Sequence, residues 1–596
     1  MSEFVEELEE LEELEDSRLS LDINAIDKHF PKEKYREGQR EAIEFAVNAI
    51  NDGKKIIILE CPTGSGKSAI GMTIADMVDT AYYLTITKIL QDQLTDDFGD
   101  KIVELKGRSS YPCTFYDRFG NSFVNRKLWS QAQLDEAKAK APDCGTGFCR
   151  SKLSPSKDKF KCDKCFLKTG VADSGKPKGD LDNLPPGMTY SACPYYEQIH
   201  KAIRSRKVVM NFSSFLFQTQ MTKRFEEPRD VMIIDECHNV EPQLLDFVSF
   251  TITDQHLSNH GIFIPELDHA YEYKVWMEDS KIHEILWERI KQARIDDNSK
   301  LEDDLARILK KYQMFMEHMK KDEEAEWVCE YEEKSGSKGE SHRKVTLKPV
   351  FAKNFADQLL FKYSKCIVMM SATILDVNVV CRSLGVDRKD VAAYRVKNYF
   401  PKENRPIKII PVAKMTGGKT RMDIWGPLLV TAVNKIVRSH KGEKGIIHTH
   451  NFAIMDYLLH RCDPDVKKRL SHQRNYKDKK EMLEAHALNK LDPVIIAPAM
   501  HEGIDLADDL SRFQIICKVP YANCFDDQQL ARRVEVDRPY YTWLTALKLV
   551  QSYGRSIRSK EDHAITYILD ESIYKFIKDA GKMLPIWFKE AIIDEG

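Results

Sequence analysis

The sequence predicts an α/β protein built on parallel, doubly wound sheets, and three observations carry that prediction. An apolar run at residues 56–59 ends in a glycine-bearing turn that opens a helical pattern. Further strand-like runs alternate with helical stretches along the chain, as crossover connections between parallel strands require. A second strand–helix series begins after the prolines Pro401 and Pro406. The chain is therefore expected to hold two such sheets.

The turn after the first strand has the composition of a phosphate-binding loop. Residues 56–68 read IIILECPTGSGKS. Glycines let backbone N–H groups point inward, a lysine can reach the β- and γ-phosphates, and a serine hydroxyl can ligate Mg²⁺. Cys61 departs from the strict pattern, which has glycine there, and a glycine-rich turn without a ligand is the plain alternative. We expect ATP and Mg²⁺ at Pro62, Thr63, Gly64, Ser65, Gly66, Lys67, Ser68 and Ala69.

The bulk composition is ordinary for a globular protein. The chain has 596 residues, a formal net charge of -3 and 42% hydrophobic residues. Some of its acidic residues lie in one stretch, residues 3–16. Any basic surface for nucleic acid must therefore be local. No apolar run approaches the ~20 residues of a membrane span, and the N-terminal stretch is acidic rather than a basic signal peptide. We expect a soluble protein that lies inside the cell and meets no membrane.

The segments on either side of the loop add candidate contacts. YREGQREAIEFAVNAI precedes the loop and has a helical pattern whose start carries Arg36 and Gln39. An amide in this place can read an adenine edge, although an amphipathic helix with a polar face is the alternative. AYYLTITKIL follows the loop helix as a strand rich in Tyr, Thr and Ile, so Thr85, Thr87 and Lys88 are expected at its carboxyl end.

Residues 106–205 interrupt this alternation and are expected to form an insertion held by metal rather than by a core. Six of the chain's 14 cysteines lie here: Cys113, Cys144, Cys149, Cys162, Cys165 and Cys193. The four inner ones could make a tetrahedral zinc site. Alternatively, the outer two join one inner pair and supply the four thiolates of an iron–sulfur cluster. Two close pairs argue against six unrelated buried cysteines.

Two later strand ends carry carboxylates and hydroxyls. RDVMIIDECHNVE ends an apolar run in Asp235 and Glu236, which could hold Mg²⁺ and deprotonate the attacking water of a phosphoryl transfer. An exposed acidic turn is the alternative. CIVMMSATI ends in Ser371 and Thr373, whose hydroxyls can relay between a nucleotide and a second ligand. Between these strands, residues 245–345 are charged with 3.6-residue spacing and are expected to form a helical insertion.

The last third of the chain repeats the strand–helix alternation without a phosphate loop of its own. Its expected strands lie in EKGIIHTHNF, DPVIIAPAMHEGIDLADDL, RFQIICKVPY and HAITYILD. A helix carrying LVQSYGRSIRS is expected to place Gln551, Arg555 and Arg558 on one face. Such arginines suit charges offered across a cleft to a nucleotide on the first domain, with a basic helix surface as the alternative.

The ordered set of motifs resembles superfamily 2 helicases, whose first motif tolerates a non-glycine residue at the position of Cys61. The matching stretches are YREGQ, ECPTGSGKS, YLTITKILQDQL, DECH, MSAT, HEGIDL and QSYGRSIR. KGRSSYPC, CPYY and NYFPKENRP further resemble the XPD/DinG family of iron–sulfur helicases. The resemblance covers about residues 30–575 and implies two RecA-like motor domains, with a cluster domain and a helical Arch domain inserted in the first. It also implies ATP-driven 5′→3′ movement on single-stranded DNA.

The resemblance implies roles for individual residues as well. The ATPase core is Lys67, Ser68, Asp235 and Glu236, with Gln39 as a base contact and Arg555 and Arg558 as arginine fingers. Coupling roles fall to His238, Ser371, Thr373, Glu502, Gly503 and Asp505, and the expected nucleotide contacts also include Arg36 and Gln551. Cys113 and Cys193 match the outer ligands of a [4Fe-4S] cluster. The inner pair resembles either archaeal members, at Cys162 and Cys165, or bacterial ones, at Cys144 and Cys149.

The resemblance and the composition together give an expected domain division. An acidic tail covers residues 1–20, and motor domain 1 consists of the three segments 21–105, 205–244 and 346–397. The cluster insertion covers 106–204 and the Arch-like insertion covers 245–345. Motor domain 2 covers 398–596. The expected partners are single-stranded DNA and duplex junctions, and the expected state is a monomer. An RNA helicase or a translocase that does not unwind is one alternative. A metal-binding scaffold with a vestigial ATPase is another.

Overall fold

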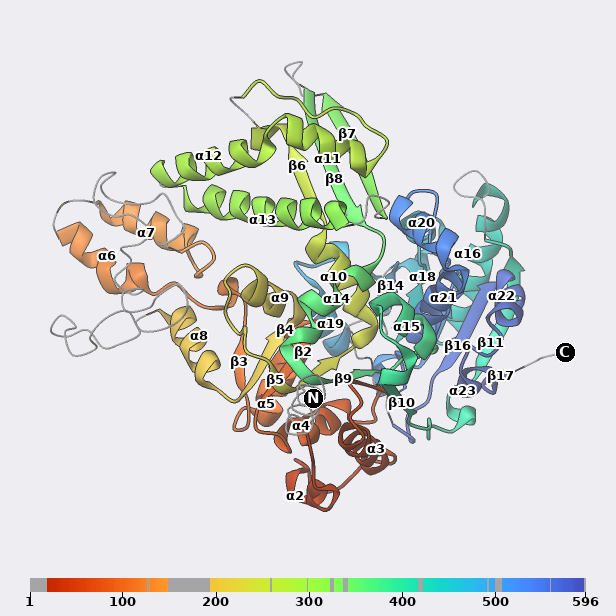
Figure 1. Cartoon of the computed structure of the whole chain (residues 1–596). Coiled ribbons are helices and arrows are strands. Elements are labelled where there is room, and N and C mark those ends of the chain that lie inside the picture. The colour runs from red at the N-terminus through yellow and green to blue at the C-terminus, as the bar shows by residue number, and fades with distance from the viewer. Residues whose placement is uncertain are drawn as a thin grey trace.

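The computed structural model describes residues 19–125, 127, 129–147, 193–257, 260–296, 298–321, 326–335, 341–415, 422–489, 493–498, 506, 508–557 and 559–593. Two parallel β-sheets flanked by helices dominate it, and a smaller antiparallel sheet with three long helices stands above them in Figure 1. We call the units built on the two parallel sheets domain 1 and domain 2. The expectation of an α/β protein with two parallel-sheet domains is confirmed.

Domain 1 is built on a seven-stranded parallel sheet in the order β10-β1-β9-β5-β2-β4-β3. Its strands are β1 (Ile56–Glu60), β2 (Ala81–Thr85), β3 (Val103–Leu105), β4 (Lys207–Asn211), β5 (Arg229–Asp235), β9 (Ser364–Ser371) and β10 (Val391–Arg395). Its helices are α2 (Ile26–His29), α3 (Gln39–Asn51), α4 (Lys67–Asp76), α5 (Lys88–Phe98), α8 (Pro194–Arg204), α9 (Phe212–Gln220), α10 (Val240–Val248), α14 (Ala356–Leu359) and α15 (Val377–Leu384). Because β9 pairs with both β1 and β5, the carboxyl ends of these three strands meet at one edge of the sheet.

The side chains of β1 explain why this strand lies inside the sheet of domain 1, between β10 and β9. Ile56 and Ile58 belong to one hydrophobic core, while Ile57 and Leu59 belong to another. Successive side chains of a strand point to opposite faces, so each face of the sheet needs its own cover of helices. Burying one such side chain contributes about 1.5–3 kcal/mol. The apolar run therefore fixes the strand from which the phosphate loop departs.

Domain 2 has a second seven-stranded parallel sheet, in the order β13-β14-β12-β15-β16-β11-β17. Its strands are β11 (Ile407–Ala413), β12 (Gly445–His448), β13 (Leu470–Ser471), β14 (Val494–Ala497), β15 (Phe513–Ile516), β16 (Ile565–Asp570) and β17 (Ile592–Ile593). Its helices are α16 (Met422–Ser439), α17 (Phe452–Arg461), α18 (Pro464–Lys467), α19 (Lys479–Leu488), α20 (Gln528–Val536), α21 (Arg538–Tyr553), α22 (Ser572–Ala580) and α23 (Ile586–Lys589). The four strands expected from the sequence are all present.

The insertion between α10 and α14 differs from the purely helical expectation. It contains α11 (Ala270–Asp279), α12 (Ile282–Ile295) and α13 (Ser299–Lys321), but also an antiparallel sheet in the order β6-β8-β7. The strands are β6 (Phe250–Thr253), β7 (Trp327–Ser335) and β8 (Ser341–Pro349). We call this unit the Arch-like insertion and the end of β8 at Pro349, past the expected boundary at residue 345, its base. Figure 1 shows it above the sheet of domain 1.

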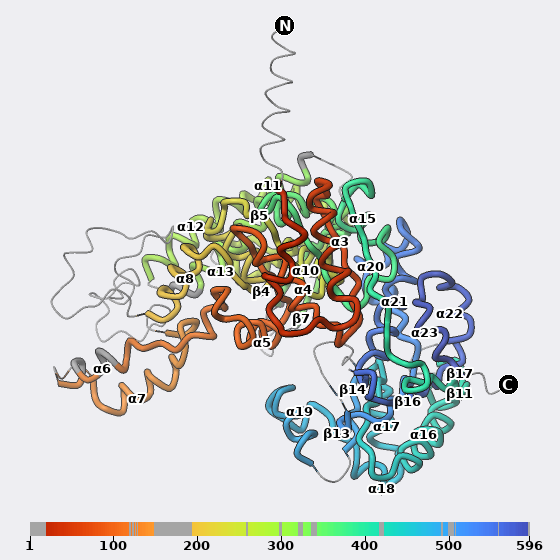
Figure 2. Tube along the Cα trace, turned by 90° about the horizontal axis from the view of Figure 1, so that it is seen from below, coloured from red at the N-terminus to blue at the C-terminus, as the bar shows by residue number. Residues whose placement is uncertain are grey.

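The described part of the cysteine-bearing insertion contains α6 (Phe115–Asn125) and α7 (Gln131–Lys140), which extend to the left of domain 1 in Figure 1. A small core of Phe115, Tyr116, Leu134, Ala137 and Ala141 holds this pair together. The helices of domain 2 lie beside those of domain 1 in Figure 2. None of the helices in the described ranges is long and apolar enough to cross a membrane.

Candidate nucleotide site and domain interface

The phosphate loop connects β1 to α4, as expected from the sequence. Gly64 and Gly66 have φ values of 82° and 78°, a region that residues with a Cβ rarely adopt. A Cβ added at Gly66 would lie 2.2 Å from Nε2 of Gln39, so the loop also has no room for a side chain there. Lys67 begins α4, and the loop therefore ends at a helix N-terminus.

Gln39 and Arg36 hold the loop from the outside. Arg36 Nη1 donates to the carbonyl oxygen of Gly64 at 2.5 Å, and Gln39 Nε2 donates to that of Gly66 at 3.1 Å. The Arg36 backbone N–H donates to Gln39 Oε1 at 2.6 Å. The structure thus brings both residues to the site, where the Gln39 amide contacts the phosphate loop itself. Its expected contact with a base remains a prediction.

Lys67 lies between the two acidic residues that follow β5. Its Nζ is 3.4 Å from Oε1 of Glu236, and Asp235 Oδ1 accepts a hydrogen bond from the Glu236 backbone N–H at 2.9 Å. Burial raises the pKa of Asp235, Lys67 opposes this and the neighbouring Glu236 carboxylate adds to it, so the pKa is raised to about 6. Burial would lower the pKa of Lys67, but the two carboxylates outweigh that effect and raise it. Three charged groups are therefore held together in a buried site.

Glu236 has a backbone conformation that marks a special position. Its φ of 51° is in the left-handed region, which costs a residue with a side chain about 1–2 kcal/mol. This turn directs the chain from β5 into the short 3₁₀ helix Cys237–Asn239. Burial raises the pKa of the Glu236 carboxyl, but Lys67, His238 and Arg555 more than offset this, so the pKa is lowered overall. Glu236 is thus held as a carboxylate.

His238 connects domain 1 to domain 2. Its Nε2 lies 2.8 Å from Nε2 of Gln551 on α21, and its Nδ1 lies 2.8 Å from Oγ of Ser371 at the end of β9. The amide nitrogens of Gln551 and Asn239 are both donors to Nε2, so the imidazole carries its proton on Nδ1 and donates it to Ser371. Ser371 Oγ also accepts from the Thr373 backbone N–H and lies 3.5 Å from Oε2 of Glu236.

The expectation that Gln551, Arg555 and Arg558 share one helical face is wrong in part. Helix α21 ends at Tyr553 with Gly554 as its C-cap, so Arg555 lies beyond the helix. Arg555 Nε nevertheless donates to the carbonyl oxygen of Gln551 at 3.0 Å. Arg555 and Gln551 line a pocket together with Pro62, Thr63, Glu236 and Thr373 of domain 1. Arg558, Glu502, Gly503 and Asp505 fall outside the residues that the structure describes.

One contact at the site was missed by sequence reasoning. Burial raises the pKa of the Tyr83 hydroxyl well above its ordinary value, and the Asp235 and Glu236 carboxylates raise it further. Tyr83 belongs to β2, which is separated from β1 by the two strands β9 and β5 in the sheet order. The alternation of β2 places Tyr83 on the same core face as Ile57 and Leu59. This strand alternation is a signal in the sequence that could have identified Tyr83 as a residue of this core face. Cys61, in the same core, is fully buried, and burial raises its thiol pKa to about 12.

Three of the six clustered cysteines are described, and two of them converge. Cys144 Sγ lies 3.9 Å from Cys193 Sγ, and the Cys144 thiol donates to the Pro112 carbonyl oxygen at 3.4 Å. Pro112 pairs with Asp143 in an antiparallel bridge, which brings Cys113 beside Cys144 along the chain fold. A hydrogen bond from Cys144 lowers the pKa of the Cys193 thiol to about 6. The two convergent thiols supply part of the ligand set of a metal centre. Among the described residues, no group of three or more cysteine, histidine or acidic side chains is placed to hold a metal ion. Cys149, Cys162 and Cys165 lie outside the described ranges.

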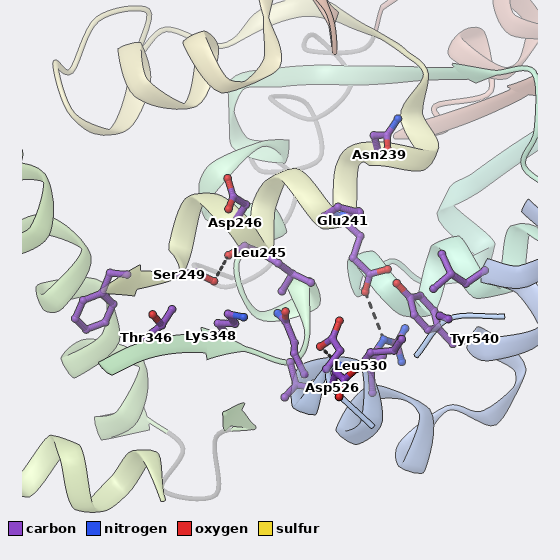
Figure 3. A pocket seen from close by; sticks show the side chains of 18 of the residues that line it. Asn239, Glu241, Leu245, Asp246, Ser249, Thr346, Lys348, Asp526, Leu530 and Tyr540 are labelled. Carbon is purple, nitrogen blue, oxygen red and sulfur yellow. Dashed lines mark hydrogen bonds and ion pairs between the residues drawn. The ribbon is translucent and has the colours of Figure 1, made fainter. Parts of the chain in front are cut away.

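A large cavity adjoins the site on the side of the Arch-like insertion. It measures about 1260 Å³, and His238 and Gln551 line one end of it. Figure 3 shows Glu241 and Asp246 on the wall formed by α10 and Asn239 just before this helix. Thr346 and Lys348 lie on β8, and Asp526, Leu530 and Tyr540 belong to domain 2. Its charged side chains carry both signs, so it is not a uniformly basic groove. Among described residues, this cavity brings together both domains and the insertion.

Comparison with known proteins gives three matching family models. "Type III restriction enzyme, res subunit" matches residues 32–138, "DEAD_2" matches 146–257, and "Helicase C-terminal domain" matches 434–591. They follow one another in the order in which the motifs occur. The first includes the phosphate loop, the second includes Asp235 and Glu236, and the third includes Gln551 and Arg555.

Curated relatives match short segments. The chain is 30% identical over 93 residues to the ATP-dependent DNA helicase CHL1 of Candida albicans, and 28% identical over 119 residues to that of Debaryomyces hansenii. These segments make up 13% and 17% of this chain, and they span only 11% and 14% of those two proteins.

Solved structures match almost the whole chain. One described as "XPD_Helicase" has a TM-score of 0.57 at 14% identity, covering 92% of this chain and 98% of the other. The structure of S. tokodaii Xpd4 has a TM-score of 0.51 at 12% identity, covering 94% and 99%. At such low identity, these matches establish a shared fold.

Proposed function

We propose that this chain, whose domains are those of an XPD-like helicase of superfamily 2, is an ATP-dependent DNA helicase. The observation that carries the proposal is the composite site. Lys67 and Glu236 of domain 1 lie 3.4 Å apart, and Gln551 and Arg555 of domain 2 line a pocket with Glu236. A site divided between two domains lets nucleotide turnover move one domain against the other. Domains 1 and 2 are then the two motor domains.

The residues suggest a division of labour in ATP hydrolysis. Backbone N–H groups of the phosphate loop and the ammonium group of Lys67 would bind the phosphates. Phosphate oxygens compete with Glu236 for that ammonium group, so ATP binding would free the Glu236 carboxylate to accept the proton of the attacking water. Mg²⁺ held by Ser68 and Asp235 would neutralise negative charge on the phosphates. Arg555, with Arg558, would approach the transferring phosphoryl group from domain 2.

The hydrogen bonds of His238 would transmit the state of the nucleotide from domain 1 to domain 2. Ser371 Oγ lies 3.5 Å from Glu236 and 2.8 Å from His238, and His238 contacts Gln551. A change at Glu236 therefore has a path of hydrogen bonds into α21. We propose coupling roles for His238, Ser371 and Thr373 on this basis, and a role for Gln551 as the receiving group.

The proposed substrate is single-stranded DNA, including strands that enter duplex junctions, and the proposed direction is 5′→3′. The relatives named above are described as ATP-dependent DNA helicases. Affinity for a nucleic-acid strand that contacts lysines and arginines falls as salt rises. We propose that the protein works as a monomer on one strand.

ATP turnover with and without single-stranded DNA tests the proposal. We expect stimulation by DNA in the native chain, loss of turnover in Lys67→Ala and Glu236→Gln, and native turnover in the control Lys389→Ala, whose side chain is 77% exposed. Turnover that ignores nucleic acid but disappears in Lys67→Ala would leave an ATPase and contradict a helicase. Strand displacement on partial duplexes with 5′ or 3′ tails, built from DNA or RNA, decides direction and substrate.

For the cysteine-bearing insertion we propose a metal centre held by Cys113, Cys144, Cys193 and one of Cys149, Cys162 and Cys165. The 3.9 Å separation of Cys144 Sγ and Cys193 Sγ supports the pairing of an inner with an outer cysteine. A zinc site made only from the four inner cysteines would leave Cys193 without a role. An iron–sulfur cluster would take four thiolates here, with zinc as the alternative metal.

A further inference from the structure

Helix α20 of domain 2 touches domain 1 and the Arch-like insertion at the same time. Gln529 Nε2 donates to the carbonyl oxygen of Pro349 at 2.5 Å, at the base of the insertion. One turn further along the same helix, Arg533 is only 4% exposed. An arginine is almost never buried to this extent unless its charge is paired. Its partners therefore show what the helix holds together.

The guanidinium group of Arg533 has partners from three parts of the molecule. Its Nε lies 3.4 Å from Oε1 of Glu241 on α10, and its Nη2 donates to Ser383 Oγ on α15 at 3.0 Å. Its Nη1 donates to Asp537 Oδ2 within domain 2 at 3.2 Å. The ring of Phe351, just after the base of the Arch-like insertion, lies 4.8 Å from Arg533 Cζ. One side chain thus joins domain 2 to domain 1 and to the insertion.

The elements that carry the partners of Arg533 adjoin the candidate nucleotide site. Glu241 follows Asp235, Glu236 and His238 within a few residues, and it is only 5% exposed. Helix α15, which carries Ser383, follows the strand end with Ser371 and Thr373. Figure 3 draws the Glu241 ion pair beside Tyr540 at the wall of the cavity. Movement of either element would shift a partner of Arg533.

Neighbouring contacts make this a firm junction rather than a single ion pair. Asp537 also accepts from Arg382 of α15, with the nearest nitrogen at 3.1 Å. Trp543 Nε1 of α21 donates to the Ile374 carbonyl oxygen at 2.8 Å. The Tyr540 ring lies 4.3 Å from Arg533 Cζ and packs against the guanidinium group. These contacts exclude water, which strengthens the charged interactions.

We propose that Arg533 is a positioning residue that transmits the nucleotide-driven movement of the two domains to the Arch-like insertion. The proposal rests on the function proposed above. A nucleotide bound between Lys67 and Arg555 would draw domain 2 toward domain 1. Because Arg533 and Gln529 lie on one helix, the same displacement would act on Glu241 and on the base of the insertion. The insertion would then change its position in step with ATP turnover.

Hydrogen–deuterium exchange of the full chain, with and without a nonhydrolysable ATP analogue and Mg²⁺, tests the link. In the native chain we expect the analogue to slow exchange at β7 and β8 as well as at the phosphate loop. In Arg533→Gln, we expect the loop to respond with an analogue Kd within about twofold of native, while β7 and β8 no longer respond. If Arg533 only stabilised the fold, Arg533→Gln would not retain the response of the phosphate loop while losing the response of β7 and β8.

The chain offers a matched control and graded variants. Arg532 precedes Arg533 on α20 but is 64% exposed and pairs only with Glu535 among its described ion pairs, so Arg532→Gln should respond as the native chain does. Arg533→Lys retains a charge for Glu241 but lacks the fork that reaches Asp537 and Ser383, and we expect a partial response. Ser383→Ala and Gln529→Ala remove one contact each and decide the matter if Arg533→Gln does not fold.

The outcomes separate the two proposals. A native chain that fails to bind the analogue would refute the proposed function. The link would then be judged by exchange without nucleotide, where Arg533→Gln should speed exchange at β7, β8 and α10 by at least about tenfold over Arg532→Gln. A folded Arg533→Gln chain with native exchange at these strands in both conditions would overturn the link. The link also fails if the native chain binds the analogue and β7 and β8 do not respond.

Discussion

Gln551 of domain 2 donates through its side-chain amide to Nε2 of His238 in domain 1, at a distance of 2.8 Å. Both side chains are buried, so the bond is shielded from competing water. It fixes the tautomer in which Nδ1 of His238 donates to Ser371. The nucleotide-binding edge of domain 1 is thereby joined to the end of α21.

Removal of this bond is expected to lower the rate of ATP turnover more than the affinity for ATP. A buried hydrogen bond contributes about 0.5–1.5 kcal/mol, so Gln551→Ala should reduce kcat roughly threefold to tenfold while KM changes less. Asn239→Ala is the matched control, because Asn239 also donates to His238 Nε2 but belongs to domain 1. Steady-state kinetics of both variants checks this. Equal losses of kcat in the two variants would show that the hydrogen bond between the domains contributes no more to turnover than the one within domain 1.

Gly66→Ala is expected to abolish nucleotide binding. The added Cβ would meet Gln39 Nε2 at 2.2 Å and would also have to adopt a φ of 78°. Gly53→Ala is the control for backbone strain alone, since Gly53 has a φ of 75° but nothing within 4 Å of an added Cβ. The strain costs about 1–2 kcal/mol in either variant. Calorimetric titration with ATP should show native affinity for Gly53→Ala only, and lost affinity in both would refute the steric explanation.

The stability of the protein without nucleotide should depend on pH through Asp235. Its folded pKa is raised from 3.8 to about 6, so the folded chain retains this proton after the unfolded chain has lost it. The stabilisation from the retained proton is full below pH 4 and is lost as pH rises to about 6. Asp235→Asn lacks this loss, so its free energy of unfolding, measured by denaturant titration at each pH, should rise relative to that of the native chain across this range. The gain should be about 3 kcal/mol and then level off. A difference that is constant from pH 4 to 7 would contradict the raised pKa.

Cys144→Ser is expected to remove the metal from the cysteine-bearing insertion, as are Cys113→Ser and Cys193→Ser. The thiols of Cys144 and Cys193 lie 3.9 Å apart, and Cys113 follows the bridge that joins Pro112 to Asp143, so loss of one ligand is expected to leave the proposed centre with too few. Cys329→Ser is the control, because Cys329 lies on β7 of the Arch-like insertion. Metal analysis of protein purified without oxygen gives iron or zinc content per chain, and brown colour near ~400 nm identifies a cluster. Native metal content in Cys144→Ser would place the centre on other cysteines.

Much of domain 1 could be predicted because its strands are continuous apolar runs. The run Ile56–Leu59 has no polar residue to compete with burial, and the glycines after it allow only a turn. The acidic pair and Ser371 were found by the same logic, since each follows a buried strand. Their convergence depends on the sheet order, in which β9 lies between β1 and β5. That order is determined by long-range pairing, which a local pattern does not contain.

Other features depended on tertiary contacts and were not predicted. The end of α21 at Tyr553 depends on Gly554, whose lack of a side chain outweighs the helical spacing of the arginines beyond it. The hairpin of β7 and β8 is rich in charged residues and resembles a solvated helix in sequence, although its partner β6 covers one edge. The sequence does not single out Arg533, because its partners Glu241 and Ser383 lie far from it in the chain.

The parallel pairing of β1 has a consequence for how the chain folds. Ile56 pairs with Ile367 on one side and with Val391 on the other, so β1 has no neighbour until β9 has been synthesised and lacks its second neighbour until residues beyond 391 have been synthesised. Closing such long loops makes folding slow, and unpaired parallel strands are prone to aggregate in the meantime. Both insertions emerge from the ribosome before this sheet can be completed. A nascent chain that stops before β9 should therefore depend on chaperones, and truncated versions of domain 1 should be insoluble.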